Sequence, residues 1–238
     1  GKPFIFAVGA DLTGVPFIGS RDQALEIARA GHAAYAAFSD LPVPTFAFVN
    51  GAAMGGGVEL ALSAPCRRTS AGVPGVALPE FFLGRVPGWG GCWMLPNRIG
   101  VERSITVVID NPLSQNRMLK GVDAYRLGMA DALLEPADFL EESVAWAARV
   151  LSGEVTVERS EVDRDETAWD AAIAKARGLA DVKTGRQAKS PYAALDLLAA
   201  ARTATREEGF AAEDEVLADL LMSDELRAGL YAFDLVQR

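Results

Sequence analysis

Two glutamates, Glu59 and Glu80, stand in glycine-rich frames and are the residues of this sequence best suited to do chemistry. Glu59 ends the segment Gly51-Ala-Ala-Met-Gly-Gly-Gly-Val-Glu59, while Glu80 follows Leu78-Pro79 and precedes an apolar Phe-Phe-Leu run. Two carboxylates that meet in one pocket can hold a water molecule and divide the roles of general acid and general base. We expect Glu80 to be the protonated partner, because its surroundings are the more apolar.

Backbone amides near these carboxylates are candidate donors to a developing negative charge. Gly56 lies in a glycine triplet between an expected strand and an expected helix, where first-turn N–H groups have no acceptor within their own helix. The segment from Phe6 to Leu12, which includes Ala10, can bring a second N–H to the same pocket. Together these features suggest an enzyme that stabilises an enolate-like anion while adding or removing water. Two structural explanations stay open: glycines that only allow close packing, and a Glu59 that only complements its helix dipole.

Other kinds of site fail on spacing or composition. The chain has no phosphate-binding P-loop motif, no dinucleotide-binding glycine pattern and no Gly-x-Ser-x-Gly nucleophile motif. His32 is the only histidine, and we expect it on a helix surface or lining, so zinc and histidine-based sites lack ligands. Trp89 lies between two glycines, where it walls an acyl pocket or joins the core, whereas Trp93 is expected in the core.

Bulk composition narrows the class of partner. The chain has 238 residues, a net charge of −9 and 50% hydrophobic residues, which argues for a folded protein and against nucleic-acid binding. Two cysteines make no disulfide framework, and no apolar run is long enough to span a membrane. We therefore expect a cytoplasmic protein. The chain starts in an apolar strand and stops within a helical pattern, so we expect a fragment or part of a longer chain.

The pattern of apolar residues predicts an α/β front half and an all-helical back third. The expected strands and helices before the middle of the chain are a strand at 4–8, a helix at 21–38 that begins after Ser20, a strand at 43–49, a helix at 56–64, a strand near 73–78, short helices at 88–98 and 102–110, a helix–glycine–strand unit at 121–134 and a helix at 137–151. A charged linker is expected at 154–166, followed by helices near 167–181, 191–205 and 210–236.

The three motifs, in this order and spacing, resemble the crotonase (enoyl-CoA hydratase/isomerase) superfamily across about residues 4–152. They are Gly-Ala-Asp-Leu from Gly9, Asn-Gly-x-x-x-Gly-Gly-Gly-x-Glu from Asn50, and Leu-Pro-Glu-x-x-Leu-Gly-x-x-Pro-Gly-x-Gly-Gly from Leu78. Residues 187–238 resemble the helical segment of multifunctional β-oxidation proteins, in which a 3-hydroxyacyl-CoA dehydrogenase domain follows. No dehydrogenase dinucleotide motif follows here, so that activity is not expected.

The resemblance implies a role for each matching residue. Ala10 and Gly56 match the two N–H donors of the family's oxyanion hole, and Glu59 and Glu80 match its two catalytic glutamates. Asp11 and Leu12 lie where the family's loop meets the CoA moiety, although Thr13 stands where the family often has a basic residue. No metal and no permanently bound cofactor are implied, and a coenzyme A thioester would be the substrate.

The resemblance implies a crotonase-like ββα spiral fold, N-terminally incomplete, followed by an all-helical segment. We expect a catalytic core at 1–152, a charged linker and helix at 153–186, and at 187–238 a helical segment leading to a dehydrogenase domain. The expected activity is hydration of trans-2-enoyl-CoA to 3-hydroxyacyl-CoA in fatty-acid β-oxidation. The alternatives are an enoyl-CoA isomerase, an acyl-CoA hydrolase, or a non-catalytic docking fragment of a larger complex. Expected partners are acyl-CoA and either further copies of the chain or a dehydrogenase domain of the same parent protein.

Overall fold

Two small parallel sheets form the front half of the molecule. The computed structural model describes residue 2 and residues 4–237. One sheet has the strand order β1-β3-β5 and the other the order β2-β4-β6, and every strand pair is parallel. The strands are β1 (Ile5–Ala7), β2 (Phe46–Val49), β3 (Ala52–Met54), β4 (Cys66–Ser70), β5 (Val76–Ala77) and β6 (Ala132–Leu134).

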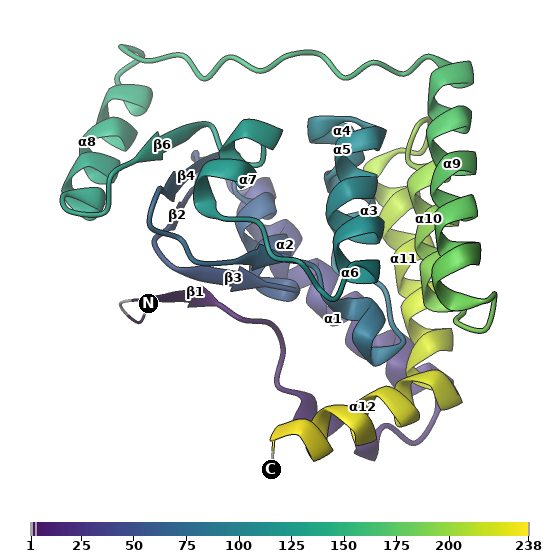
Figure 1. The fold of residues 1–238 in the computed structure, drawn as a ribbon. Helices are drawn as coiled ribbons and strands as arrows, with labels where there is room; N and C mark the ends of the chain where they lie inside the picture. The colour runs from purple at the N-terminus through teal and green to yellow at the C-terminus, as the bar shows by residue number, and fades with distance from the viewer. Residues whose placement is uncertain (1, 3, 238) are drawn as a thin grey trace.

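Helices connect these strands and cover the sheets (Figure 1). Ser20 caps the first long helix by accepting a hydrogen bond from the N–H of Gln23, as its position in the sequence predicts. The helical elements up to the linker are η1 (Leu12–Phe17), α1 (Arg21–Asp40), α2 (Gly56–Ser63), η2 (Glu80–Leu83), α3 (Gly91–Met94), α4 (Pro96–Ile99), α5 (Val101–Ile105), the π-helical turn η3 (Thr106–Asp110), α6 (Asn111–Leu113), α7 (Gly121–Leu127) and α8 (Phe139–Leu151).

The strand β4 was not expected, because its sequence Cys-Arg-Arg-Thr-Ser has no apolar run. Arg67 in this strand is 1% exposed, and its guanidinium donates to the carbonyl oxygens of Met129 and Ala64 at 2.9 and 2.6 Å. Asp131 accepts from the backbone N–H of Arg67 at 2.7 Å and also contacts its guanidinium. The buried arginine is thus satisfied by Ala64 nearby and by Met129 and Asp131, and the local pattern could not indicate these two distant partners.

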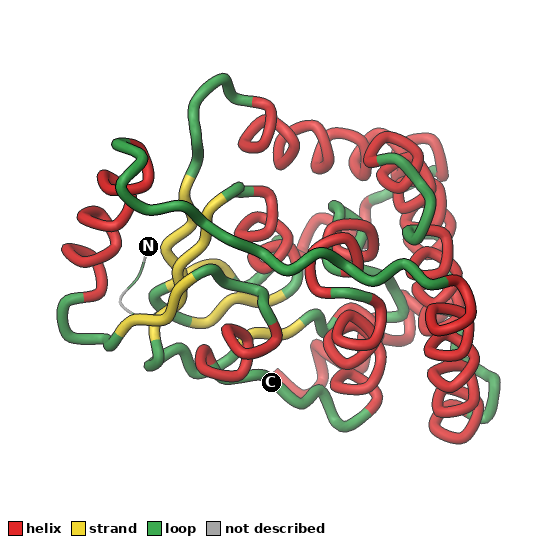
Figure 2. The backbone as a smooth tube through the Cα atoms, turned by 90° about the horizontal axis from the view of Figure 1, so that it is seen from above, coloured by secondary structure: helices red, strands yellow, loops and turns green. Residues whose placement is uncertain are grey.

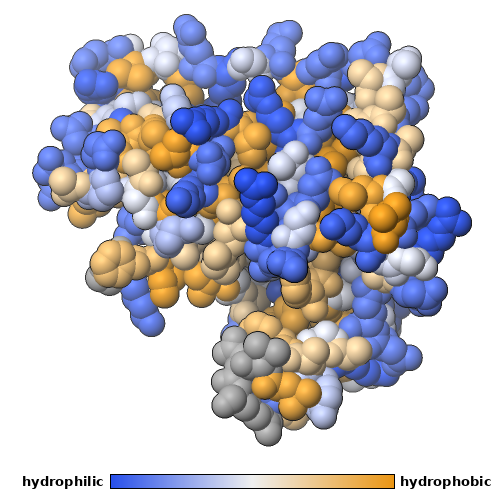
Figure 3. Space-filling model, viewed as in Figure 1, coloured by the Kyte–Doolittle hydropathy of each residue, from blue (hydrophilic) through white to orange (hydrophobic). Residues whose placement is uncertain are grey.

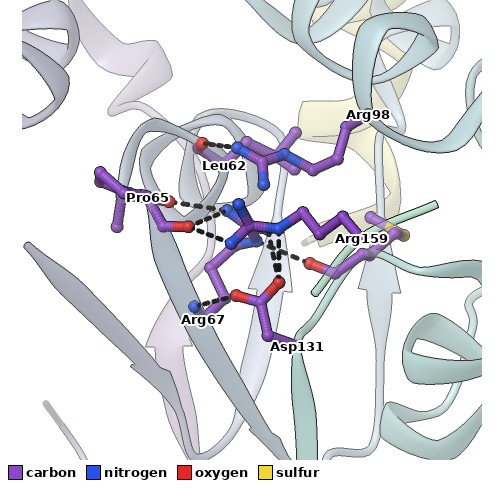
Figure 4. Close-up of polar contacts among 8 residues, drawn as sticks. Leu62, Pro65, Arg67, Arg98, Asp131 and Arg159 are labelled. Atoms are coloured by element: carbon purple, nitrogen blue, oxygen red, sulfur yellow. Dashed lines mark hydrogen bonds and ion pairs between the residues drawn. The ribbon is translucent and has the colours of Figure 1, made fainter. Parts of the chain in front are cut away.

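The linker between α8 and α9 runs as an extended strap across the molecule (Figures 1 and 2). Arg159 fastens it: its guanidinium donates to Asp131 at 2.8 Å and to the carbonyl oxygen of Pro65 (Figure 4). Farther along, Arg164 donates to the carbonyl oxygen of Arg202 at 2.6 Å. The charged residues of this segment are therefore its attachment points to the body.

The back third is helical and packs on the front half. It consists of α9 (Glu166–Thr184), α10 (Ser190–Ala200), α11 (Arg206–Leu221) and α12 (Asp224–Gln237). The helix α11 lies along α1 and also contacts α3, and α10 packs against α9 and α3. One apolar core runs from Ala47 in β2 to Leu220 in α11, so the tail is packed on the front half, as its apolar faces predict. The division into three segments remains a prediction.

The helix expected over 210–236 is in fact two helices. Ser223 separates them: its hydroxyl donates to the carbonyl oxygen of Leu220 at 2.6 Å and accepts from the N–H of Leu226 at 3.1 Å. This side chain therefore satisfies backbone groups at the end of α11 and the start of α12. The turn directs α12 toward η2 and the first loop of the chain.

The helix α12 and the segment η1 lie side by side and project from the body (Figure 1). A groove of about 640 Å³ lies between them, and its apolar lining includes Leu12, Val15, Leu226 and Leu230. Figure 3 shows apolar residues gathered on this projecting part. The side chain of Phe17 is 82% exposed there.

Candidate active site

Glu59 occupies the first turn of α2 and is 2% exposed. Its carboxylate oxygen Oε1 accepts hydrogen bonds from the backbone N–H groups of Trp89 at 2.8 Å and Gly91 at 3.0 Å. Gly91 needs its small size, because a Cβ there would lie 3.0 Å from the same oxygen and 2.7 Å from Pro87. The glycine-rich turn around Trp89 therefore holds the carboxylate of Glu59, which follows the glycine triplet at 55–57.

Glu80 begins the short helix η2 and is also 2% exposed. Its oxygen Oε1 would lie 2.6 Å from a Cβ at Gly55, a residue with a positive φ of 53° immediately before α2. Its other oxygen, Oε2, is buried and makes no hydrogen bond to any described residue. A buried polar atom without a partner is costly, so this oxygen is available to a substrate or a water molecule.

Burial is the main influence on the ionisation of both glutamates. Burial, followed by the nearby charges of Glu80 and Glu213, raises the pKa of Glu59 to about 8. Burial also raises the pKa of Glu80, and Arg85 opposes that change. Two like charges in one buried site resist ionising together, so near neutral pH the pair retains a proton. One carboxyl group can then act as an acid and the other as a base.

Close packing brings the first loop of the chain to the start of α2. A Cβ at Gly57 would lie 2.1 Å from the carbonyl oxygen of Ala7 in β1, so only glycine fits. A Cβ at Gly55 would lie 3.8 Å from the Cα of Gly9, which has a φ of 94°. The glycine triplet therefore has the packing function that the sequence left open, and it places the first loop beside the site.

Two backbone amides are available at this junction. The N–H of Ala10, one residue after Gly9, makes no hydrogen bond to any described residue. The N–H of Gly56 is the first of α2 and has no carbonyl acceptor within that helix. Both predicted donors thus lie in segments that meet beside the Glu80 carboxyl group.

Trp89 covers the start of α2. Its ring packs edge-on against Tyr35 of α1, with centroids 5.3 Å apart, and a Cβ at Gly56 would meet both side chains at 3.1 Å. The indole Nε1 is buried and has no hydrogen-bond partner among the described residues. Its role as the wall of an acyl pocket remains a prediction.

Asp11 has a local role. Its carboxylate accepts from the backbone N–H of Thr13 at 2.9 Å and from the Thr13 hydroxyl at 2.8 Å, and these bonds hold its pKa below the usual range. Asp11 thereby caps η1, and Leu12 lines the groove beside α12. Their expected contact with CoA remains a prediction.

His32 was expected on the surface or the lining side of its helix, and the surface alternative is wrong. The residue is 5% exposed rather than on the surface, and its Nδ1 lies 2.6 Å from Oδ1 of Asp214 in α11. Its Nε2 lies 3.4 Å from Oε2 of Glu213, and its ring stacks on Phe210 with centroids 4.3 Å apart. The carboxylates that bury this histidine lie more than 180 residues away, which is why its own surroundings in the sequence did not reveal them.

Glu213 is the residue near the site that sequence reasoning missed. It is 0% exposed, although it stands in an acidic run. A signal was present: Phe210, Glu213, Asp214 and Leu217 share one face of a helix at the i, i+3, i+4, i+7 spacing. Carboxylates that share a helix face with buried apolar residues must find buried partners.

Metal-ligating side chains do not gather in the described part of the chain into any group of three or more that could hold an ion. No helix among the described residues has the length and the apolar character needed to cross a membrane.

Comparison with known proteins identifies the family of the chain. The sequence profile of the enoyl-CoA hydratase/isomerase family matches residues 1–160. The chain belongs to this family. Within it, the chain is 28% identical over 243 aligned positions to the fatty acid oxidation complex subunit alpha of Colwellia psychrerythraea, which covers 97% of this chain and 32% of that protein. The chain thus spans about a third of the length of that relative.

Solved structures show the crotonase fold. An enoyl-CoA hydratase from Rhodobacter sphaeroides superposes with a TM-score of 0.70 at 20% identity, over 99% of this chain and 74% of that one. A carnitinyl-CoA dehydratase from Mycobacterium thermoresistibile gives a TM-score of 0.68 at 20% identity, over 95% and 72% of the two chains. At this identity the likeness is one of fold, and the α/β class expected from the sequence is confirmed.

Proposed function

We propose that this chain is an enoyl-CoA hydratase, which adds water to trans-2-enoyl-CoA to give 3-hydroxyacyl-CoA. The observation that carries the proposal is the buried pair Glu59 and Glu80, together with the N–H of Ala10, which has no acceptor among the described residues, and the first N–H of α2. The name of the fatty acid oxidation relative agrees with such a substrate. The family also contains isomerases, but moving a double bond needs only one carboxylate to carry a proton, so two glutamates favour hydration.

In this proposal the thioester carbonyl accepts hydrogen bonds from the N–H groups of Ala10 and Gly56. Such donors, aimed in advance at an oxyanion, contribute ~3–4 kcal/mol each to lowering a barrier. Both act through the backbone, so the chain needs no particular side chain at either position.

The two glutamates then share the proton transfers. Glu59 accepts two N–H bonds at Oε1, which stabilise its charged form, and in that form, which becomes populated as pH approaches its pKa of about 8, it takes a proton from the attacking water. The hydroxyl adds to the β-carbon of the substrate. Glu80, whose Oε2 has no partner in the described structure, delivers its proton to the α-carbon and so discharges the enolate.

The acyl chain is proposed to extend toward the groove between η1 and α12. Leu12 lines this groove two residues after Ala10, and α12 packs on η2, the helix that begins with Glu80. The groove offers an apolar lining to an acyl tail, and its two walls are joined through the chain to the loop of Ala10 and to η2.

Product analysis in H₂¹⁸O tests the reaction class. A hydratase places one ¹⁸O atom on the 3-hydroxyl of an intact CoA thioester. An isomerase gives an unlabelled enoyl-CoA with a shifted double bond, and a hydrolase releases free CoA and a labelled carboxylate. Labelled 3-hydroxyacyl-CoA is the expected product, and either other pattern would overturn the assignment.

A further inference from the structure

The turn at Trp89–Trp93, whose backbone N–H groups bind Glu59, also donates hydrogen bonds to a second buried carboxylate. Glu213 of α11 accepts a hydrogen bond from the N–H of Gly90 at Oε2, at 2.6 Å, and from the N–H of Trp93 at Oε1, at 2.7 Å. Its side chain is 0% exposed. Both oxygens of the carboxylate are therefore committed to one short stretch of backbone.

The neighbouring amides of the same stretch face the other way. The N–H groups of Trp89 and Gly91 donate to Glu59, so successive amides alternate between Glu59 on one side and Glu213 on the other. A shift of the turn toward either carboxylate would lengthen the hydrogen bonds to the other. The orientation of Glu59 is thus mechanically tied to a helix 150 residues later in the chain.

His32 and Asp214 complete the support. His32 Nε2 lies 3.4 Å from Glu213 Oε2, and Nδ1 lies 2.6 Å from Asp214 Oδ1. The imidazole therefore hydrogen-bonds to Asp214 and lies within ion-pair distance of Glu213, so a protonated ring supplies the cation that a buried acid needs. Stacking on Phe210 fixes the plane of the ring.

Charged and titratable groups surround the turn from every element packed against it. They are Glu59 of α2, Glu80 of η2, His32 and Tyr35 of α1, Arg85 and Cys92 of the loop and α3, and Glu213 and Asp214 of α11. Among them, Glu213 adds to the rise in the pKa of Glu59, after burial and Glu80. Burial raises the pKa of Glu213, and His32 opposes that rise.

We propose that Glu213, supported by His32, is a positioning residue that fixes the turn at Trp89–Trp93 and through it the carboxylate of Glu59. Within the helical tail, Glu213 alone then supplies the far side of the clamp, and it acts through the turn rather than on the substrate. This inference rests on the proposed function for its effect on turnover, and on geometry alone for its effect on Glu59.

The test combines kinetics with amide NMR on Glu213→Gln. A glutamine keeps the shape but turns an N–H donor toward one of the two amides. We expect kcat to fall by roughly 10- to 100-fold with KM within about twofold, because a small misplacement of a catalytic group is costly. The amide signals of Trp89 and Gly91, which report the ionisation of Glu59, should titrate near pH 8 in the wild type and at lower pH in the variant, because the charge of Glu213 no longer raises the pKa of Glu59.

Glu215→Gln is the matched control. Glu215 stands on the same helix but pairs with Arg21 at the surface, where its side chain is 48% exposed. The control removes the same charge without touching the turn, so kcat and the Trp89 and Gly91 midpoints should stay at wild-type values.

A second variant, His32→Gln, serves if Glu213→Gln does not fold. Without the cation, the amides of Gly90 and Trp93 should titrate at higher pH than in the wild type, because the pKa of Glu213 rises. Unchanged midpoints in both variants, together with unchanged kcat, would overturn the clamp. Shifted midpoints in a protein that hydrates no enoyl-CoA would support the clamp and overturn the proposed function instead.

Discussion

At the scale of single residues, the two glutamates are held in an unusually demanding environment. Both are 2% exposed, and neither forms an ion pair with any described residue. Glu59 is compensated only by backbone N–H groups, and one oxygen of Glu80 by nothing in the described structure. Buried carboxyl groups with raised pKa values cluster at functional sites, which favours a catalytic over a structural role.

The pH dependence of stability tests the environment of Glu59 directly. Its folded-state pKa of about 8 lies above the ordinary value of 4.5, so the folded protein binds this proton more tightly than the unfolded chain. Ionising the buried carboxyl group lowers the free energy of unfolding. This loss is absent below the ordinary pKa and grows as pH rises through about 8. Glu59→Gln removes it, so the Tm of the variant relative to wild type should rise by several degrees between pH 5 and pH 9, at about 2–4 °C per kcal/mol.

Calorimetry at a series of pH values makes this measurement. Glu158→Gln, in the exposed part of the linker, is the control and should show no such trend. A difference in Tm between Glu59→Gln and wild type that is constant with pH would contradict the raised pKa.

Gly56 tests the second backbone donor. Gly56→Val places methyl groups where a Cβ already lies 3.1 Å from Trp89 and from the Tyr35 hydroxyl. We expect turnover to be abolished while far-UV circular dichroism shows a persistent fold. The control is Gly178→Val in α9, where an added Cβ would meet no atom within 4 Å, and this variant should keep wild-type turnover. Activity surviving in Gly56→Val would place the thioester elsewhere.

At the scale of elements, the attachment of β4 to the linker depends on one carboxylate. Asp131 binds both Arg67, which is buried in β4, and Arg159 of the linker (Figure 4). Asp131→Asn would leave Arg67 without an anionic partner in the described structure, and breaking a buried pair in this way costs about 3–5 kcal/mol. Urea denaturation should show that the free energy of unfolding falls by this amount.

Asp123→Asn is the comparison for that variant. Asp123 pairs with Arg126 on the surface, where the side chains are 47% and 74% exposed. Exposed ion pairs contribute roughly 0–1 kcal/mol, so Asp123→Asn should lower the free energy of unfolding only slightly. Equal losses in the two variants would show that Asp131 is not a buried anchor.

Elements with strong local signals were predictable from the sequence. The helix α1 has its Ser20 cap, and the α7–β6 unit has its helix stop at Gly128, whose φ is 90°. The strand β4 was missed because it has no apolar run, and because two partners of Arg67, Met129 and Asp131, lie far along the chain. The break at Ser223 was missed because the apolar pattern continues through it, and only a hydroxyl turn interrupts the helix.

The site follows the same rule. Short motifs in the sequence identify the four expected site residues, and the structure brings their segments together. These residues are Ala10, Gly56, Glu59 and Glu80. Glu213 and His32 depend on helices that meet only after folding, so no local pattern paired them. Their expected roles differ accordingly: motif residues touch substrate, and the late helix supports them.

At the scale of the whole molecule, the tail and the front half share one core. Leu195, Leu198 and Leu220 of the tail are buried in the same apolar cluster as the residues of the sheets. Deleting residues 187–238 should expose this surface and lower the melting temperature or the solubility. A soluble remainder with an unchanged melting temperature would make the tail an independent module.

Turnover of trans-2-enoyl-CoA by wild type, Glu59→Gln and Glu80→Gln tests the central claim most directly. The assay follows loss of the conjugated enoyl thioester, with short and long acyl chains. Binding of a 3-hydroxyacyl-CoA is measured in parallel, to show that each variant still holds its ligand. We predict hydration by the wild type, a loss of ~10²–10⁴ in rate in each variant, and retained binding in both. Near-native turnover in either variant, or no hydration by the wild type, would contradict the account.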